Sequence, residues 1–194
     1  FGRHGLGSPA TQLMRAVSHS IKMRYSMIEI RDEQTGDQDG VRRVNLAAFK
    51  NGPEAGVVDK LHQSGTRFHS FVAIDQGEIV GHILFTPVRL EGEEVVGAGL
   101  APMAVLPERQ GKGVGSQLVR YGLARMRTEE YPFVVVLGHP TYYPRFGFER
   151  ASKYKLRCQW DVPDDVFMAA VFDLAVLPKE GGLVRYRGEF DECT

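Results

Sequence analysis

Cysteine is scarce in this sequence, with Cys158 and Cys193 the only two among 194 residues. They stand in unrelated contexts, without the CxxC or Cys/His spacing of metal sites, so neither a disulfide framework nor a zinc site is supported. We therefore expect no bound metal. A chain so poor in cysteine fits a reducing compartment, and we predict a cytoplasmic protein.

An excess of charge of one sign is also lacking, because 24 Lys and Arg residues balance 24 Asp and Glu residues. No overall field then favours nucleic acid or an anionic membrane, and we expect neither as a partner. Long apolar runs are missing as well, since no stretch approaches the roughly eighteen apolar residues that span a bilayer. The hydrophobic content of 43% is sufficient for one buried core.

Acidic residues are absent from residues 1–26, which contain four Lys or Arg residues and no apolar core of a signal peptide. A transit peptide has this composition. We favour a flexible leader or an added extension, because Met27 directly precedes the first convincing strand. Residues 27–194 contain no linker rich in Pro, Gly or Ser and no internal repeat, so we predict a single domain there.

Strand and helix patterns alternate along this domain. Phe133–Leu137 is continuously apolar and mostly β-branched, which is typical of a central strand covered on both faces. Strands are predicted at 27–31, 68–75, 78–90, 94–105, 133–137, 148–151 and 167–174, helices at 37–49, 54–64 and 114–127, and a short helix or turn at 140–146. The predicted fold is α+β, an α/β/α sandwich whose mixed, mostly antiparallel sheet has helices on both faces.

The segment Gln110-Gly111-Lys112-Gly113-Val114-Gly115 joins an apolar strand to a helix. Alternate glycines permit close backbone approach, so several N–H groups can point at one anion at the helix N-terminus. Arg109 and Lys112 add mobile positive charge. A Walker loop requires Ser or Thr after Gly-Lys, and a dinucleotide fingerprint requires a third glycine where Ser116 stands, so neither motif fits. The alternative interpretation is a glycine-rich start of a helix that binds no ligand.

The strand before this loop contains Pro102, which cannot donate a ladder hydrogen bond and therefore predicts an edge or a bulge. Together, Leu100–Gly115 and the segment Tyr142-Tyr143-Pro144-Arg145-Phe146-Gly147-Phe148 resemble the GNAT superfamily of acyl-CoA N-acyltransferases. The resemblance covers residues 27–151. Within the superfamily, the Gly-Leu-Ala-Pro-Met-Ala-Val stretch and the tail at 163–172 are similar to a bacterial subgroup labelled YhbS-like.

This resemblance implies an N-acetyltransferase that uses acetyl-CoA as co-substrate and moves acetyl to a primary amine by direct attack in a ternary complex. It implies Tyr143 as the general acid and His139 as a cofactor contact; an aromatic plug is the alternative role for Tyr143. It implies that the acyl-pantetheine arm is held by Met103, Ala104 and Val105 and the pyrophosphate by Arg109, Gln110, Gly111, Lys112, Gly113, Val114 and Gly115. Ordinary edge-strand packing is the alternative for Pro102 and Met103.

The general base is the element that the sequence does not supply. Many members of the superfamily carry a Glu or Asp on the strand before the phosphate loop, and residues 95–105 contain no carboxylate. A water chain, His82 or His139 could carry the proton instead, since histidine titrates near neutral pH. Each histidine can equally be structural.

The acceptor site is expected between the first two helices, the meander and the last strands. Phe49, Tyr154 and Trp160 are candidates for an aromatic wall, and Glu54 or Asp164 for pairing with an ammonium group. The rival hypotheses are a non-catalytic acyl-CoA-binding or regulatory module, and a phosphate-binding fold without acyl chemistry. Exposed strand edges make a homodimer plausible.

Overall fold

The computed structural model describes residues 28–50 and 52–191, with the side chains of residues 53–55 excepted. The predicted leader, residues 1–26, lies outside the described residues. Among the helices that are described, none is long and apolar enough to cross a membrane.

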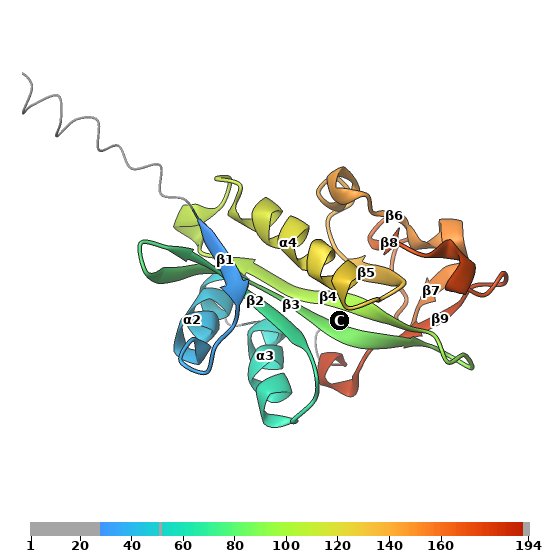
Figure 1. Cartoon of the computed structure of the whole chain (residues 1–194), viewed down its shortest axis with the longest axis horizontal. Helices are drawn as coiled ribbons and strands as arrows, with labels where there is room; N and C mark the ends of the chain where they lie inside the picture. The colour runs from blue at the N-terminus through green and yellow to red at the C-terminus, as the bar shows by residue number, and fades with distance from the viewer. Residues whose placement is uncertain (1–27, 51, 192–194) are drawn as a thin grey trace, which may run out of the picture.

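A single mixed sheet forms the centre of the molecule (Figure 1). Its strands are β1 (Glu29–Asp32), β2 (His69–Asp75), β3 (Glu78–Leu90), β4 (Val96–Val105), β5 (Phe133–Leu137), β6 (Glu149–Arg150), β7 (Leu156–Cys158), β8 (Phe167–Val171) and β9 (Gly182–Arg185). The main path runs β1-β2-β3-β4-β5-β8-β6, and β9 pairs with both β3 and β7. Among the described strands, only the pairs β4–β5 and β7–β9 are parallel. The prediction of a mixed, mostly antiparallel sheet is confirmed.

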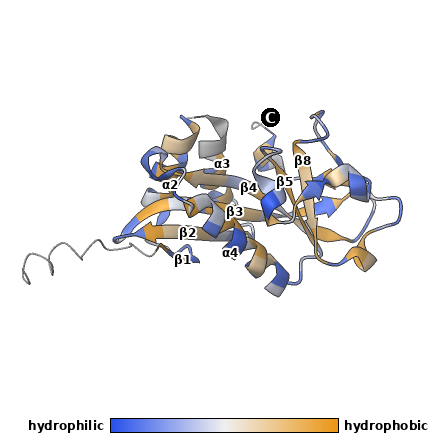
Figure 2. Ribbon diagram, turned by 90° about the horizontal axis from the view of Figure 1, so that it is seen from above, coloured by the Kyte–Doolittle hydropathy of each residue, from blue (hydrophilic) through white to orange (hydrophobic). Residues whose placement is uncertain are grey.

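Helices cover both faces of this sheet, as the sequence predicts. In Figure 2, α2 (Gln38–Phe49) and α3 (Pro53–Gln63) lie on one side of the strands, and α4 (Val114–Thr128) lies on the other. Helix α2 buries Val41 and Val44, and α4 buries Leu118, Val119 and Met126. These apolar stripes at helical spacing supply the two layers of the core on either side of the sheet.

The C-terminal third departs from the predicted strand pattern. The strand predicted at 167–174 ends at Val171, because the amides of Phe172 and Asp173 bond to Pro132 O and the Asp173 carboxylate then accepts from the Ala175 amide. The strand predicted at 148–151 shrinks to β6. Strands β7 and β9 were not predicted, since segments of three and four residues are too short for a periodic signal.

A chain of polar side chains is buried where β2 and β3 meet α2 and α3. Asn45 donates to His82 Nδ1 at 3.0 Å, and His82 Nε2 lies 2.9 Å from the Ser70 hydroxyl, which donates to Glu33. His62 Nε2 completes the chain at 3.0 Å from the same carboxylate. These bonds satisfy polar groups that would otherwise be costly to bury.

His82 is fully buried within this chain, and burial lowers its pKa from 6.5 to about 3. Its Nδ1 accepts from Asn45, so the neutral ring donates from Nε2 to Ser70. The residue lines neither of the two pockets described below. These observations favour a structural role for His82 over that of a general base.

His82 makes stability depend on pH. The unfolded chain takes up a proton below pH 6.5 and the folded chain does not, so the free energy of unfolding falls as pH falls from 6.5 towards 3. Between pH 7.5 and 5.5 this one group lowers the free energy of unfolding by about 1 kcal/mol. The variant His82→Gln keeps an amide between Asn45 and Ser70 and should lose about that much less stability over the same interval. Urea unfolding at both pH values tests this; equal losses in the two proteins would contradict it.

Candidate active site

Strands β4 and β5 separate part-way along their length. Their parallel pairing covers only Ala98–Leu100 against Val134–Val136. On the other side of β4, the register with β3 shifts between Leu100 and Met103, which confirms the bulge predicted at Pro102. Past this bulge, β4 has no ladder partner on its β5 side among the described strands. Backbone groups on that side can therefore pair with a ligand, apart from the Val105 carbonyl, which accepts from Gln110.

The glycine-rich loop follows directly from this end of β4. A short helical turn, η1 (Pro107–Arg109), leads to Gly111 with φ 70° and Gly113 with φ 84°, both in the left-handed region that favours glycine. Gly113 is the N-cap of α4, whose first N–H groups have no partner within the helix. A Cβ on Gly115 would lie 2.9 Å from the Tyr142 hydroxyl, so glycine also permits this close approach. The loop thus has the geometry of an anion site.

Two polar side chains of the loop hold it in place. The Arg109 guanidinium forms an ion pair with Asp75, which is 2% exposed at the end of β2, and Gln110 Nε2 donates to Val105 O at 3.0 Å. The prediction that Arg109 carries mobile charge is therefore wrong: its charge is committed to Asp75. Lys112 is exposed on the loop.

Two cavities open beside the separated strands. The first, which we call the loop pocket, has a volume of about 490 Å³ and is lined by the glycine loop together with Met103, Val105, Tyr142 and Arg145. The second, the aromatic pocket, also has about 490 Å³. It is lined by Leu100–Met103, Val57, the segment Leu137–Pro140, Val166 and the aromatic residues Phe49, Trp160, Tyr186 and Phe190.

The two cavities share four lining residues: Phe49, Met103, His139 and Tyr143. A molecule in the loop pocket and a second molecule in the aromatic pocket would therefore meet at the exposed end of β4. Both Tyr143 and His139, which can donate or accept protons, line this junction. The arrangement suits a group transfer between two bound molecules.

Tyr143 is held rigidly at the junction. It begins the turn η2 (Tyr143–Phe146), is 6% exposed, and packs edge-on against Tyr142 and Phe148 with ring centroids 5.0 and 5.5 Å away. Its ring lies where a Cβ on Gly138 would be, so the residue that follows β5 must be glycine. Burial raises the pKa of the phenol, and neighbouring Tyr142 adds to the rise. The phenol therefore keeps its proton at neutral pH.

Most of the predicted cofactor contacts line the two cavities, whereas Ala104 and Lys112 line neither. Of the predicted acceptor residues, Phe49 and Trp160 line the aromatic pocket. Tyr154 and Asp164 do not: Tyr154 donates to Glu149, and Asp164 pairs with Arg150 at 3.4 Å. The Glu54 side chain lies outside the described residues.

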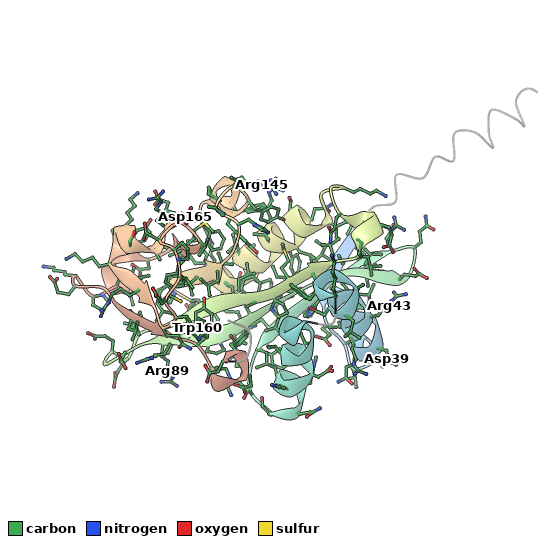
Figure 3. The ribbon with its side chains drawn as sticks, turned by 180° about the vertical axis from the view of Figure 1, so that it is seen from behind. Asp39, Arg43, Arg89, Arg145, Trp160 and Asp165 are labelled. Atoms are coloured by element: carbon green, nitrogen blue, oxygen red, sulfur yellow. The ribbon has the colours of Figure 1, made fainter. Side chains whose placement is uncertain are left out.

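Sequence reasoning missed several lining residues, among them Arg145, Tyr186 and Phe190. Arg145 lines the loop pocket and stacks 4.0 Å from the Tyr142 ring centroid. It stands inside the Tyr142–Phe148 motif, so the motif itself could have indicated it. Tyr186 and Phe190 come from the chain after β9 and carry no motif. Figure 3 labels one lining residue of each cavity: Arg145 of the loop pocket and Trp160 of the aromatic pocket.

Comparisons with known proteins agree with this geometry. A family model described as an acetyltransferase (GNAT) domain matches residues 29–151. YhbS of Escherichia coli K12, described as an uncharacterized N-acetyltransferase, is 35% identical over 163 residues, which are 84% of this chain and 98% of YhbS. The chain therefore belongs to the GNAT acetyltransferase family, a family of acyltransferases.

Two solved structures extend the comparison. The crystal structure of E. coli YhbS in complex with CoA has a TM-score of 0.80 and 34% identity, over 84% of this chain and 92% of that one. A GNAT family acetyltransferase from Brucella melitensis in complex with acetyl-CoA has a TM-score of 0.72 and 35% identity, over 86% of this chain and 100% of that one. The predicted GNAT fold is confirmed.

The Arg109–Asp75 pair predicts an effect on stability. Removing one partner of a fully buried ion pair costs about 3–5 kcal/mol. The Arg109 side chain is 35% exposed, so Arg109→Ala should lower the free energy of unfolding by less, roughly 2 kcal/mol. Arg109→Lys retains the charge and should lose less than half of that. Urea unfolding followed by circular dichroism measures both; an alanine variant as stable as the wild type would show that the pair does not anchor the loop.

Proposed function

We propose that this protein transfers an acetyl group from acetyl-CoA to a primary amine by direct attack within a ternary complex. One observation carries the proposal: the end of β4 that lacks a partner on its β5 side lies between the loop pocket and the aromatic pocket, with Tyr143 at the junction. The CoA and acetyl-CoA bound by the E. coli and Brucella relatives support it.

The loop pocket suits the diphosphate and pantetheine parts of CoA. Amides of the pantetheine arm can pair with the backbone of Met103–Val105 on the side away from β3, as an added strand does at a sheet edge. The pyrophosphate fits the N–H groups of Gly111–Gly115 at the start of α4. Arg145 lines the pocket and supplies positive charge, and the exposed Lys112 of the same loop can add to it. Arg109 and Gln110, which also line the pocket, hold the loop in shape.

Acyl transfer needs a neutral amine, a stabilised carbonyl oxygen and a proton for the departing thiolate. Acetyl-CoA would supply the activated acetyl group. A backbone N–H in Met103–Val105 stabilises the negative charge that develops on the carbonyl oxygen. Tyr143 donates its proton to the thiolate sulfur, and His139, which lines both cavities, accepts a proton from the attacking nitrogen. A homodimer and a cytoplasmic location stay predictions.

The proposal is tested by free-thiol release from acetyl-CoA with a panel of amines, together with calorimetric titration of acetyl-CoA and ADP. Amine-dependent thiol release and binding of acetyl-CoA at least tenfold tighter than ADP are expected. Equal affinity for acetyl-CoA and ADP would contradict the assignment of the pantetheine site. Binding without turnover of any amine would instead favour a non-catalytic acyl-CoA-binding module.

Two arginine variants test whether Arg145 contributes to acetyl-CoA binding. Arg145→Ala should weaken acetyl-CoA binding several-fold, because this side chain lines the loop pocket. Arg150→Ala is the matched control, since Arg150 is exposed and pairs with Asp164 away from both cavities. Equal affinities of the two variants would remove Arg145 from the phosphate site.

Tyr143→Phe separates catalysis from binding. The phenyl ring preserves the packing against Phe148 and Gly138, so affinity for acetyl-CoA should stay within twofold. Loss of the proton donor should lower kcat about 10²-fold or more, the range of general acid catalysis. Because the pKa of Tyr143 is raised, the wild type should lose no activity through phenol ionisation up to pH 10. Steady-state kinetics would exclude Tyr143 as the acid if kcat were unchanged.

A further inference from the structure

The aromatic pocket has an unusual chemistry for a site that receives an amine. Among its described lining residues there is no Asp, Glu, Lys or Arg. Its titratable lining groups are His139, Tyr143 and Tyr186, and burial raises the pKa of both tyrosines. The described lining therefore offers no negative charge to an entering ammonium group.

A lining whose described residues include no carboxylate disfavours basic amines. An alkylammonium such as a lysine side chain has a pKa of about 10.4 and is charged at pH 7. Moving it from water into an apolar pocket is costly unless a counter-charge receives it. It must also lose a proton before it can attack, and His139 is the described lining residue suited to accept one. An amine that is already neutral avoids both costs.

The walls of the pocket favour a flat ring. The rings of Trp160 and Tyr186 lie 5.0 Å apart at 37°, and those of Tyr186 and Phe190 lie 6.0 Å apart at 65°. Tyr186 reaches this position because residue 99 is glycine, where a Cβ would lie 2.7 Å from its ring. Aromatic surfaces at such spacings gain energy from an added ring beyond the area that it buries. A volume of about 490 Å³ is within the range of small-ligand pockets.

We propose that the acceptor is a small arylamine, a primary amine carried directly on an aromatic ring, without further charged groups. Conjugation of the nitrogen lone pair with the ring keeps such an amine neutral at pH 7. The ring would lie among Phe49, Trp160 and Tyr186, with the nitrogen at the junction beside Met103 and Tyr143. This inference rests on the proposed acetyl transfer.

The proposed transfer needs one proton acceptor, His139, and one proton donor, Tyr143. The nitrogen forms a bond to the acetyl carbon and the carbon–sulfur bond breaks. One proton leaves the nitrogen for His139, and Tyr143 protonates the thiolate. Exchange with solvent then restores both side chains. The products are an N-aryl acetamide and CoA.

Three acceptors test the preference for a neutral amine on an aromatic ring. They are aniline, 2-phenylethylamine and 1,4-diaminobutane, each assayed with acetyl-CoA at pH 7. Aniline and 2-phenylethylamine share a ring and differ in charge, whereas the diamine lacks the ring. We expect kcat/KM for aniline to exceed that for 2-phenylethylamine, and to exceed that for the diamine at least tenfold. A diamine accepted as well as aniline would overturn the inference while leaving the acetyltransferase proposal intact.

Lining variants test whether the preference comes from this pocket. Trp160→Leu should raise the KM for aniline several-fold without changing affinity for acetyl-CoA, and Trp160→Phe should recover part of the loss. Val166→Glu adds a carboxylate to the lining and should shift preference towards 2-phenylethylamine. Tyr154→Phe is the control, because Tyr154 is an aromatic residue outside the pocket. Equal effects of Trp160→Leu and Tyr154→Phe would contradict the assignment.

Varying the acyl chain length tests whether the aromatic pocket holds the acyl group of the donor and not the acceptor. If the aromatic pocket holds the acyl group, octanoyl-CoA should be used more efficiently than acetyl-CoA, and that result would overturn the inference. Failure of acetyl-CoA to bind would instead refute the proposed function itself. If acetyl-CoA binds tightly but none of the three amines causes release of free CoA thiol, the arylamine assignment is overturned.

Discussion

The separation of β4 from β5 at Pro102 is the constraint on which the site depends. A central strand normally satisfies its backbone on both sides, and this one does so only as far as Leu100 on its β5 side. The free groups beyond it can be satisfied by a ligand that behaves like a strand. The same separation makes room for two cavities that meet at Met103. Binding and chemistry would therefore share one stretch of backbone.

Neighbouring contacts keep this opening in shape. The Arg109–Asp75 pair and the bond from Gln110 to the Val105 carbonyl fasten the glycine loop to the ends of β2 and β4. Tyr143 is held by packing against Tyr142 and Phe148, and Gly138, just after β5, leaves room for its ring. A rigid frame of this kind reduces the cost of ordering a flexible cofactor on binding. Substitutions at Arg109 should thus act mainly through loop geometry.

The sequence predicts the local features well. Pro102 marks the bulge, Gly111 and Gly113 take up the left-handed conformations, and the apolar run at β5 is central, because each depends on the residue and its immediate neighbours. Contacts between distant segments were not predictable in the same way. The commitment of Arg109 to Asp75, the arrival of Tyr186 beside Gly99 and the position of Tyr154 outside the aromatic pocket all follow from tertiary packing. The pairing of β7 with β9 is likewise a long-range event without periodicity.

Amide NMR on the ¹⁵N-labelled protein titrated with CoA tests the central claim most directly. The account predicts that the largest shifts are those of the backbone amides of Met103, Val105, Gly113 and Gly115, with little change at Asp39 and Arg43 on α2. Neither of those two residues lines either cavity. Shifts confined to α2, or an unperturbed Met103–Val105 segment under saturating CoA, would contradict the assignment of the β4 opening as the cofactor site.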